Sequence, residues 1–476
     1  MKNLSIKTLC LTIVSLILAV SFAGVSYSKP AEVKPSQVER IRILSPNNAP
    51  LKIVVVDMGQ SNEKLVRNIV RTAKEINEEM KLPKEETIRV FIICARRELS
   101  LKALERGGIE SETLKKYVEF ADDIAAFNDP WLQDFGEIAM AKMKKEDEPK
   151  LLVIDSNRGQ GLAEVPEALA KYWNCRFMKI NPELTGGGDH GGNIEVTPDD
   201  VMIIGSHASK ELIALFEKLG YKDRMAVVDT DWLAVGHCDE YISIAPNAKS
   251  PSGYTIFVAD PTLAFEIIKR ADEKDILEGT SGRYAKSLAM IKRVLAGKDI
   301  KGIMDDEDEA KEMAKRAKDI IASNKRIKKI IDANIDILMK TVDNARGTPD
   351  GMHSVVPLPV FFWEGRTKKS LAFLPDVVNL LSVRDHLIIP DPQCSVFADY
   401  IRGIVKKAGF KAHFVEDMFY HDLMGEIHCG TNVLRHPNRY VVPPSYLPEL
   451  YKRFMKERVV RDVKKDRTMR VLNEGK

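Results

Sequence analysis

The sequence predicts an α/β protein, because short apolar segments of strand length alternate with segments of helical periodicity along most of the chain. The composition agrees: 44% of the 476 residues are hydrophobic and 30% are charged, which is typical of a folded globular chain and excludes a collagenous or low-complexity one. The strands are expected at 51–57, 88–94, 151–154, 201–204, 225–229, 241–245, 255–259, 386–389 and 412–415. Helices are expected at 62–80, 209–219 and 397–407.

Residues 1–28 have the layout of a secretory signal peptide. Lys2 and Lys7 precede an apolar run at 9–23, and Ser26 and Ser28 supply small residues for cleavage. The run is shorter than the roughly 20 apolar residues that span a bilayer. We therefore expect an exported protein, periplasmic or extracellular, whose mature form has no stable membrane insertion.

The remaining chain divides by composition. Residues 29–49 are polar and contain prolines, which indicates a linker, and 50–440 carry the alternating pattern of one catalytic domain. Residues 305–340 read as long surface helices, and 441–476 as a charged helical tail. The net charge is only +3, so no global field favours a nucleic-acid partner.

Cys429 is a candidate nucleophile. One of the six cysteines lies in the signal segment, so five remain, widely spaced and odd in number, and at least one thiol is free. Cys429 lies between Gly425 and Gly430, which would let a substrate approach the backbone closely. A buried structural cysteine is the alternative. His428 is adjacent, but adjacent side chains usually diverge, so His237 is the preferred base.

His237 is followed by Asp239 and Tyr241. If the chain is extended after Gly236, these three side chains share one face, and an imidazole and a carboxylate converge on one site. A buried histidine satisfied by the neighbouring carboxylate is an equally good interpretation of this segment.

Asp134 follows Trp131 closely, which places a carboxylate beside an aromatic wall. Together with Asp239, such a site suits a planar cation, and guanidinium is the planar cation that proteins offer. An aspartate that caps a local turn is the alternative. The glycine-rich segment 186–192 lacks the features of a phosphate loop, so its carbonyls and Glu195 favour a hard cation instead.

Taken together and in this order, the segments resemble the catalytic domain of the protein-arginine deiminases, in the guanidino-group-modifying pentein superfamily. The similarity covers roughly 115–437 and leaves no counterpart for the family's N-terminal immunoglobulin-like domains. The resemblance implies a pentein fold, a five-bladed pseudo-symmetric α/β propeller around a central site. The matching motifs are WLQD at 131–134, GNIEV at 192–196, WLAVGHCDE at 232–240 and GEIHCGTN at 425–432.

The resemblance also implies an activity, which is conversion of the guanidino group of peptidyl arginine to citrulline and ammonia through a covalent cysteine thiouronium intermediate. Cys429 would be the nucleophile and His237 the general acid and base. The other expected roles are guanidinium binding by Asp134 and Asp239, a channel wall from Trp131, and contact with the substrate backbone by Arg158.

Calcium is the cofactor that the resemblance implies. A first site would take side chains of Gln133, Glu137 and Glu195 with carbonyls of Gly191 and Ile194. A second would take Asp155, Ser156 and Asn157, but Phe135 stands where the family has an acidic ligand, which weakens this second expectation.

Two departures from the family concern the substrate. Leu423 stands where animal enzymes carry an arginine, and a two-residue shortening between Ser156 and Asn157 removes another. Free arginine or another small guanidine therefore remains an alternative to peptidyl arginine. The further alternatives are amidino transfer, a catalytically silent calcium-binding module, and a zinc hydrolase using His190, His237, Asp239 and His428.

Overall fold

The computed structural model describes residues 29–125, 129–156, 158–180, 187–298, 300, 303, 306–346 and 353–443. The expected signal peptide lies outside these residues, as does the expected tail from residue 444 onward. Within the described ranges, no helix has both the length and the apolar composition that crossing a bilayer requires.

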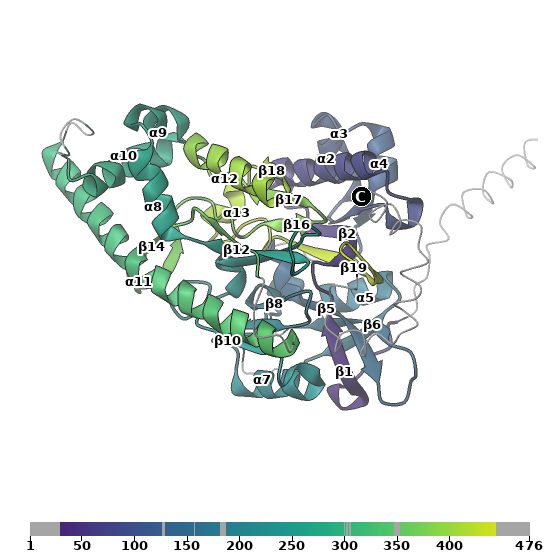
Figure 1. The fold of residues 1–476 in the computed structure, drawn as a ribbon. Helices are drawn as coiled ribbons and strands as arrows, with labels where there is room; N and C mark the ends of the chain where they lie inside the picture. The colour runs from purple at the N-terminus through teal and green to yellow at the C-terminus, as the bar shows by residue number, and fades with distance from the viewer. Residues whose placement is uncertain are drawn as a thin grey trace, which may run out of the picture.

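Five sheets share one pattern of strand pairing, in which one strand runs antiparallel to a second and the second runs parallel to a third (Figure 1). This arrangement confirms the α/β class. A separate hairpin joins β14 (Phe362–Glu364) to β15 (Ser370–Ala372). The five sheets are β19 (Thr431–Tyr440) with β2 (Asn48–Val56), β3 (Arg89–Ile93) and β4 (Val118–Ala121); β1 (Val38–Ile43) with β5 (Gly136–Met143), β6 (Lys150–Asp155) and β7 (Arg176–Lys179); β8 (Ile194–Val196), β9 (Met202–Gly205) and β10 (Met225–Val228); β11 (Ile242–Pro246), β12 (Tyr254–Ala259) and β13 (Val355–Leu358); and β16 (Leu381–Val383), β17 (His386–Pro390) and β18 (Lys411–Val415).

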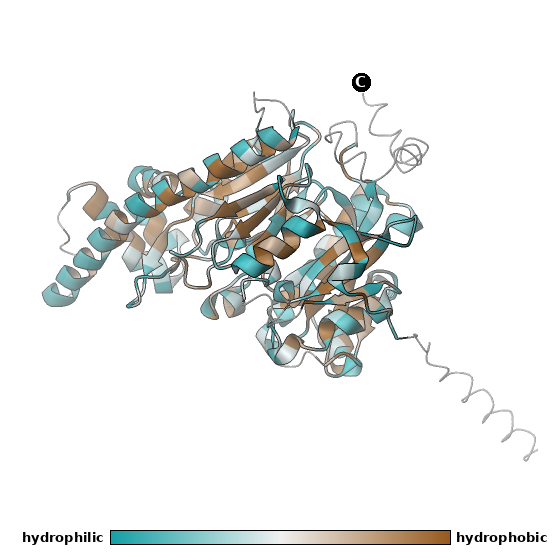
Figure 2. Ribbon diagram, turned by 90° about the horizontal axis from the view of Figure 1, so that it is seen from below, coloured by the Kyte–Doolittle hydropathy of each residue, from teal (hydrophilic) through white to brown (hydrophobic). Residues whose placement is uncertain are grey.

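Helices connect the parallel strands, as a parallel pair requires a crossover. Single helices α2 (Glu63–Met80), α5 (Val165–Tyr172), α7 (Lys210–Phe216) and α12 (Ser395–Ala408) lie in four of the crossovers. The strands in the middle of the molecule are largely hydrophobic, and the helices outside them carry hydrophilic residues on their outer faces (Figure 2). The remaining helices are α3 (Arg97–Arg106), α4 (Ser111–Tyr117), α8 (Pro261–Arg270), α9 (Glu273–Gly279), α10 (Gly282–Leu295), α11 (Glu307–Arg346) and α13 (Met418–Asp422).

The expectation of long surface helices at 305–340 is only partly correct. The segment is one 40-residue helix, α11, and its inner face is buried at positions such as Ile327 and Ile331. The buried Asn334 accepts a hydrogen bond from the Asp229 amide and donates to the Tyr241 hydroxyl, each at 2.8 Å. This buried face was missed from the sequence, because its apolar residues recur at helical spacing among many charged residues.

The segment 29–49 also differs from the linker that its polar composition indicates. Residues 38–43 form β1, which pairs with β5, and Ile41 and Ile43 are buried there. Arg42, between these two isoleucines, is also buried, so both faces of this end of the strand are covered.

A tight turn precedes β5, β8, β11, β16 and β19, and neighbouring turns are hydrogen-bonded to one another. The contacts are Gln133 N to Cys429 O (3.0 Å), Gly192 N to Asp134 Oδ1 (3.4 Å), Cys238 Sγ to Gly192 O (3.6 Å), Asn379 Nδ2 to Asp239 O (3.2 Å) and Cys429 N to Asn379 Oδ1 (3.2 Å). Taken in order they form a closed ring. Five segments far apart in sequence therefore meet at one place.

Gly136, which follows the turn of Asp134, should not tolerate a side chain. Its φ is 134°, and a Cβ would lie 2.0 Å from the Ile154 carbonyl oxygen. We expect Gly136→Ala to reduce the free energy of unfolding by about 2 kcal/mol or more, measured by urea denaturation. Gly403→Ala is the control: nothing lies within 4 Å of its Cβ position in α12, and alanine should stabilise that helix by about 1 kcal/mol. Equal stability of both variants would contradict the tight approach at Gly136.

Candidate active site

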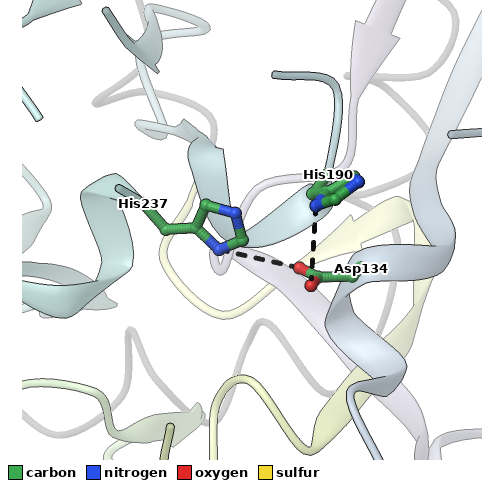
Figure 3. Close-up of side chains that lie close together, drawn as sticks. All are labelled: Asp134, His190 and His237. Atoms are coloured by element: carbon green, nitrogen blue, oxygen red, sulfur yellow. Dashed lines mark ion pairs between the residues drawn. The ribbon is translucent and has the colours of Figure 1, made fainter. Parts of the chain in front are cut away.

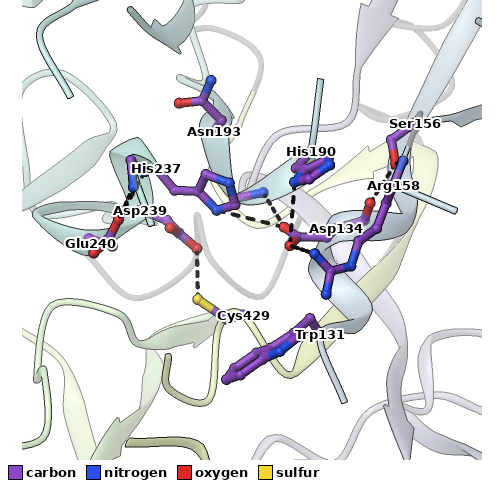
Figure 4. A network of polar contacts seen from close by, with 12 residues as sticks. Trp131, Asp134, Ser156, Arg158, His190, Asn193, His237, Asp239, Glu240 and Cys429 are labelled. Atoms are coloured by element: carbon purple, nitrogen blue, oxygen red, sulfur yellow. Dashed lines mark hydrogen bonds and ion pairs between the residues drawn. The ribbon is translucent and has the colours of Figure 1, made fainter. Parts of the chain in front are cut away.

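The Cys429 thiol lies among polar groups from other turns (Figure 4). Its Sγ accepts a hydrogen bond from Asn379 Nδ2 at 3.2 Å and donates toward Asp239 Oδ2 at 3.5 Å. The Cys429 amide donates to Asn379 Oδ1, so one asparagine holds both the sulfur and its backbone. Sequence reasoning gave Asn379 no role, because an amide within an apolar segment has no distinctive spacing.

Asp239 is held by His428. The imidazole Nδ1 lies 2.9 Å from Asp239 Oδ2, and Nε2 lies 3.4 Å from Glu195 Oε1. Although burial lowers it, the pKa of His428 is raised overall, because the Glu195 and Asp239 carboxylates favour the imidazolium. The two ring nitrogens of His428 are therefore engaged by Asp239 and Glu195.

His237 lies on the other side of the same space. Its Nδ1 is 3.7 Å from Asp134 Oδ1, and its backbone amide donates to Glu240 Oε1 at 2.9 Å. A Cβ on Gly192 would lie 2.7 Å from His237 Nδ1 and 3.1 Å from Asp239 Oδ2, so both groups approach one glycine that leaves room between them.

The extended conformation expected after Gly236 is wrong. Residues Cys238–Glu240 form a 3-10 turn, and Tyr241 is buried in the core against Asn334. The two polar groups nevertheless converge, because the turn brings His237 and Asp239 together without strand periodicity.

Arg158 forms an ion pair with the Asp134 carboxylate. Its guanidinium donates to both oxygens of Asp129, at 3.2 and 3.1 Å, and lies 3.2 Å from Asp134 Oδ2. This is a bidentate pair with a buried aspartate. Arg158 therefore lies at the guanidinium end of the site, and not extended toward a peptide backbone as expected.

Trp131 forms a wall beside the cysteine turn. A Cβ on Gly425 would lie 2.3 Å from the Trp131 ring, so the indole is in close contact with the chain that leads to Cys429. The ring also meets Tyr420 edge-on, with centroids 5.6 Å apart. The aromatic surface expected next to Asp134 is present.

His190 is a second imidazole at Asp134 (Figure 3). Its Nδ1 lies 3.8 Å from Asp134 Oδ2, and its ring is perpendicular to that of His237 with centroids 5.7 Å apart. Ligand atoms of these three residues lie within 4.8 Å of one another, the only such set of three within the described part of the chain. Asp239 and His428 do not belong to it, so the expected zinc set is divided, and the Arg158 cation already compensates Asp134.

The first expected calcium set fits the residues present. Gln133, Glu137, Ile194 and Glu195 line a cavity of about 70 Å³. Glu137 Oε1 is buried without a hydrogen-bond partner, and burial together with the Glu195 charge raises the pKa of Glu137 well above its usual value. Burial likewise raises the pKa of Glu195 to about 7. Adjacent carboxylates with an unsatisfied oxygen are the donors that calcium prefers. The Gly191 carbonyl in the adjoining turn accepts the Ile194 amide, which leaves one lone pair.

The second calcium set is less complete. Burial, opposed by Lys179 and reinforced by Asp189, raises the pKa of Asp155 to about 7. The Ser156 hydroxyl donates to the Asp134 carbonyl at 2.6 Å, and Asn157 lies outside the described residues.

The surroundings of Cys429 favour the neutral thiol over the thiolate. Burial, and then the Asp239 charge, raise the pKa of Cys429 well above its usual value. The five described cysteines are buried and form no disulfide.

The chain is similar in sequence to known proteins. Human protein-arginine deiminase type-3 is 27% identical over 339 residues, which are 65% of this chain and 47% of that protein. Human protein-arginine deiminase type-4 is 27% identical over 341 residues with the same coverage. The chain therefore spans about half the length of these relatives.

Solved structures agree with the fold. A structural-genomics structure of a candidate agmatine deiminase has a TM-score of 0.50 at 13% identity, covering 86% of this chain and all of that one. Agmatine deiminase of C. jejuni has a TM-score of 0.48 at 16% identity, covering 83% and 96%. The likeness to the first of these structures supports the α/β fold. The family model described as protein-arginine deiminase (PAD) matches residues 44–440, and with most of its length matched the chain belongs to that family.

Proposed function

We propose that the protein hydrolyses a C–N bond of a guanidino group and releases ammonia and a ureido product, which is citrulline when the substrate is arginine. The convergence of Cys429 with Asp239, His237 and Asp134 from separate turns carries this proposal. A silent binding module has no need to bring a thiol, an imidazole and two carboxylates together. The family name makes peptidyl arginine the first substrate to test.

Substrate binding activates the thiol. Asp134 and Asp239 orient the planar guanidinium, with Arg158 giving up its contact to Asp134. The substrate's positive charge, next to Cys429, lowers the thiol pKa that burial has raised. The Cys429 proton passes to His237, and the Asn379 amide, 3.2 Å away, stabilises the thiolate.

The reaction then has two stages. The thiolate attacks the guanidinium carbon, and His237 returns the proton to the departing nitrogen, so that ammonia leaves and an S-alkyl thiouronium remains. His237 takes a proton from water, the hydroxide attacks the same carbon, and the C–S bond breaks to give the ureido product and the thiol. An amine in place of water would give amidino transfer.

Calcium is the proposed cofactor, held by Gln133, Glu137 and Glu195 with the neighbouring carbonyls. When bound, it would supply positive charge that compensates the two buried carboxylates. Through its contacts with Glu195 and Asp239, His428 connects the calcium site to Asp239, one of the two carboxylates that would bind the substrate guanidinium. We also propose export on the basis of residues 1–28, and a five-bladed arrangement, which the ring of hydrogen-bonded turns supports.

Replacement of the nucleophile tests the covalent reaction. Cys429→Ala should reduce ureido-product formation by roughly 10³-fold or more, measured colorimetrically with peptidyl arginine and small guanidines. Cys94→Ala removes another buried thiol and should retain activity. Turnover by Cys429→Ala at the wild-type rate would exclude the cysteine mechanism.

The raised pKa of Cys429 predicts slow alkylation by iodoacetamide at pH 7 in the presence of a chelator. Only the thiolate reacts, so the rate should rise about tenfold per pH unit between pH 7 and 9. Mass spectrometry of the peptide containing Cys429 measures this rate. An alkylation rate that does not increase between pH 7 and 9 would show that the thiolate exists without substrate.

The calcium site is tested by calorimetry and thermal unfolding rather than by turnover. Glu137→Gln and Glu195→Gln should weaken calcium binding at least about tenfold, whereas Glu312→Gln on the exposed face of α11 should not.

Because the folded-state pKa values of Glu137 and Glu195 are raised, the chelated protein loses stability as the pH rises above the unfolded value near 4.5. Calcium should therefore stabilise most above pH 7. No calcium-dependent shift at that pH would contradict the site.

A further inference from the structure

A cavity of about 340 Å³ is lined by Cys429 together with acidic groups. Glu240, Asp376 and Glu426 lie in its wall and are 9%, 4% and 3% exposed. Carboxylates this deeply buried require compensation by a cation or by hydrogen bonds.

These acids are compensated by hydrogen bonds rather than by lysine or arginine: Glu240 Oε1 accepts the Gly236 and His237 amides and Glu426 Oε1 accepts the Asp376 amide, each at 2.9 Å. Asp376 Oδ1 accepts the Val378 amide at 2.9 Å, and no described lysine or arginine forms an ion pair with Asp376, Glu240 or Glu426. Burial accordingly raises the pKa of Asp376 to about 7. The His421 imidazole contacts Glu426 at 2.7 Å, and its own pKa is lowered by burial. Arg283, the one guanidinium in the lining, is paired with Asp422.

The rest of the wall is apolar. Trp363, Leu371 and Met424 face the same cavity, and they suit a short methylene chain. The cavity therefore brings together the Cys429 thiol, an apolar surface and buried acids for which the described residues supply no lysine or arginine partner.

We propose that the protein acts on guanidines that carry a second positive charge on a short alkyl chain, such as 4-aminobutylguanidine (agmatine), in preference to arginine. This inference rests on the proposed hydrolysis of guanidines. The ammonium group forms the missing ion pair with Asp376 and its acidic neighbours, and the guanidinium lies at Cys429. The same C–N bond breaks, water supplies the oxygen, and the products are a ureido amine and ammonia.

The same lining disfavours the two arginine substrates. The carboxylate of free arginine would enter a wall of acids. The carbonyls of a peptide need donors, but Arg283, the arginine in the cavity lining, is paired with Asp422.

Four substrates separate these possibilities: agmatine, butylguanidine, free arginine and an N-acyl-arginine amide. We expect kcat/KM for agmatine to exceed that for butylguanidine, which differs only by the missing ammonium, at least about tenfold, and to exceed both arginine compounds. Equal values for agmatine and butylguanidine, or a higher value for the acyl-arginine amide, would overturn the inference. Failure to release ureido product from any of the four would instead refute the guanidine hydrolase.

Asp376→Asn tests the acidic end directly, because it removes the charge and keeps the shape. The agmatine-to-butylguanidine ratio of kcat/KM should fall at least about fivefold, chiefly through KM. Asp399→Asn on α12, where the aspartate contacts only the exposed Arg402 among described partners, is the matched control and should leave the ratio unchanged. Glu426→Gln provides a second variant if Asp376→Asn does not fold. An unchanged ratio in the folded variants would show that these acids do not bind the ammonium.

Discussion

The centre of this protein depends on a large amount of buried negative charge that its own cations only partly compensate. Asp134 is paired with Arg158, and Asp239 with His428, whereas the acids at the calcium set and in the cavity next to Cys429 have fewer partners. Burying carboxylates in this way costs free energy unless positive charge arrives. On the proposed function, the substrate guanidinium and calcium would supply this missing positive charge, and the affinity for both would follow from the same deficit.

The repeated strand order explains why these charges meet. In each of five sheets the turn before the antiparallel strand points inward, and hydrogen bonds join each turn to the next. Residues on such turns have little conformational freedom. A side chain at Gly136 would collide with the backbone, and one at Gly192 would collide with the side chains of His237 and Asp239. Geometry is thereby set by short rigid segments rather than by long loops.

Much of this was predictable from the sequence, and the limits are physical. Strand and helix periods located most elements, and motif similarity identified Cys429, His237, Asp134 and Asp239. Asn379 was missed, and His190 was considered only as a ligand of the zinc alternative, because their contacts arise only when separate turns pack together. The period-two argument for Tyr241 failed because a 3-10 turn replaced the strand. The pairing of β1 with β5 was also missed. Residues 29–49 were assigned from their average composition, in which the few apolar residues of this edge strand are outnumbered by polar ones.

The pairing of β19 with β2 joins the end of the described fold to its beginning, with Thr431 opposite Val55. Cys429, immediately before β19, is the last of the five turn residues to be synthesised. A chain that ends before β19 would lack that pairing, and one that ends before residue 428 would lack both His428 and Cys429. The chemistry proposed for Cys429 would therefore require nearly the whole described chain to be synthesised.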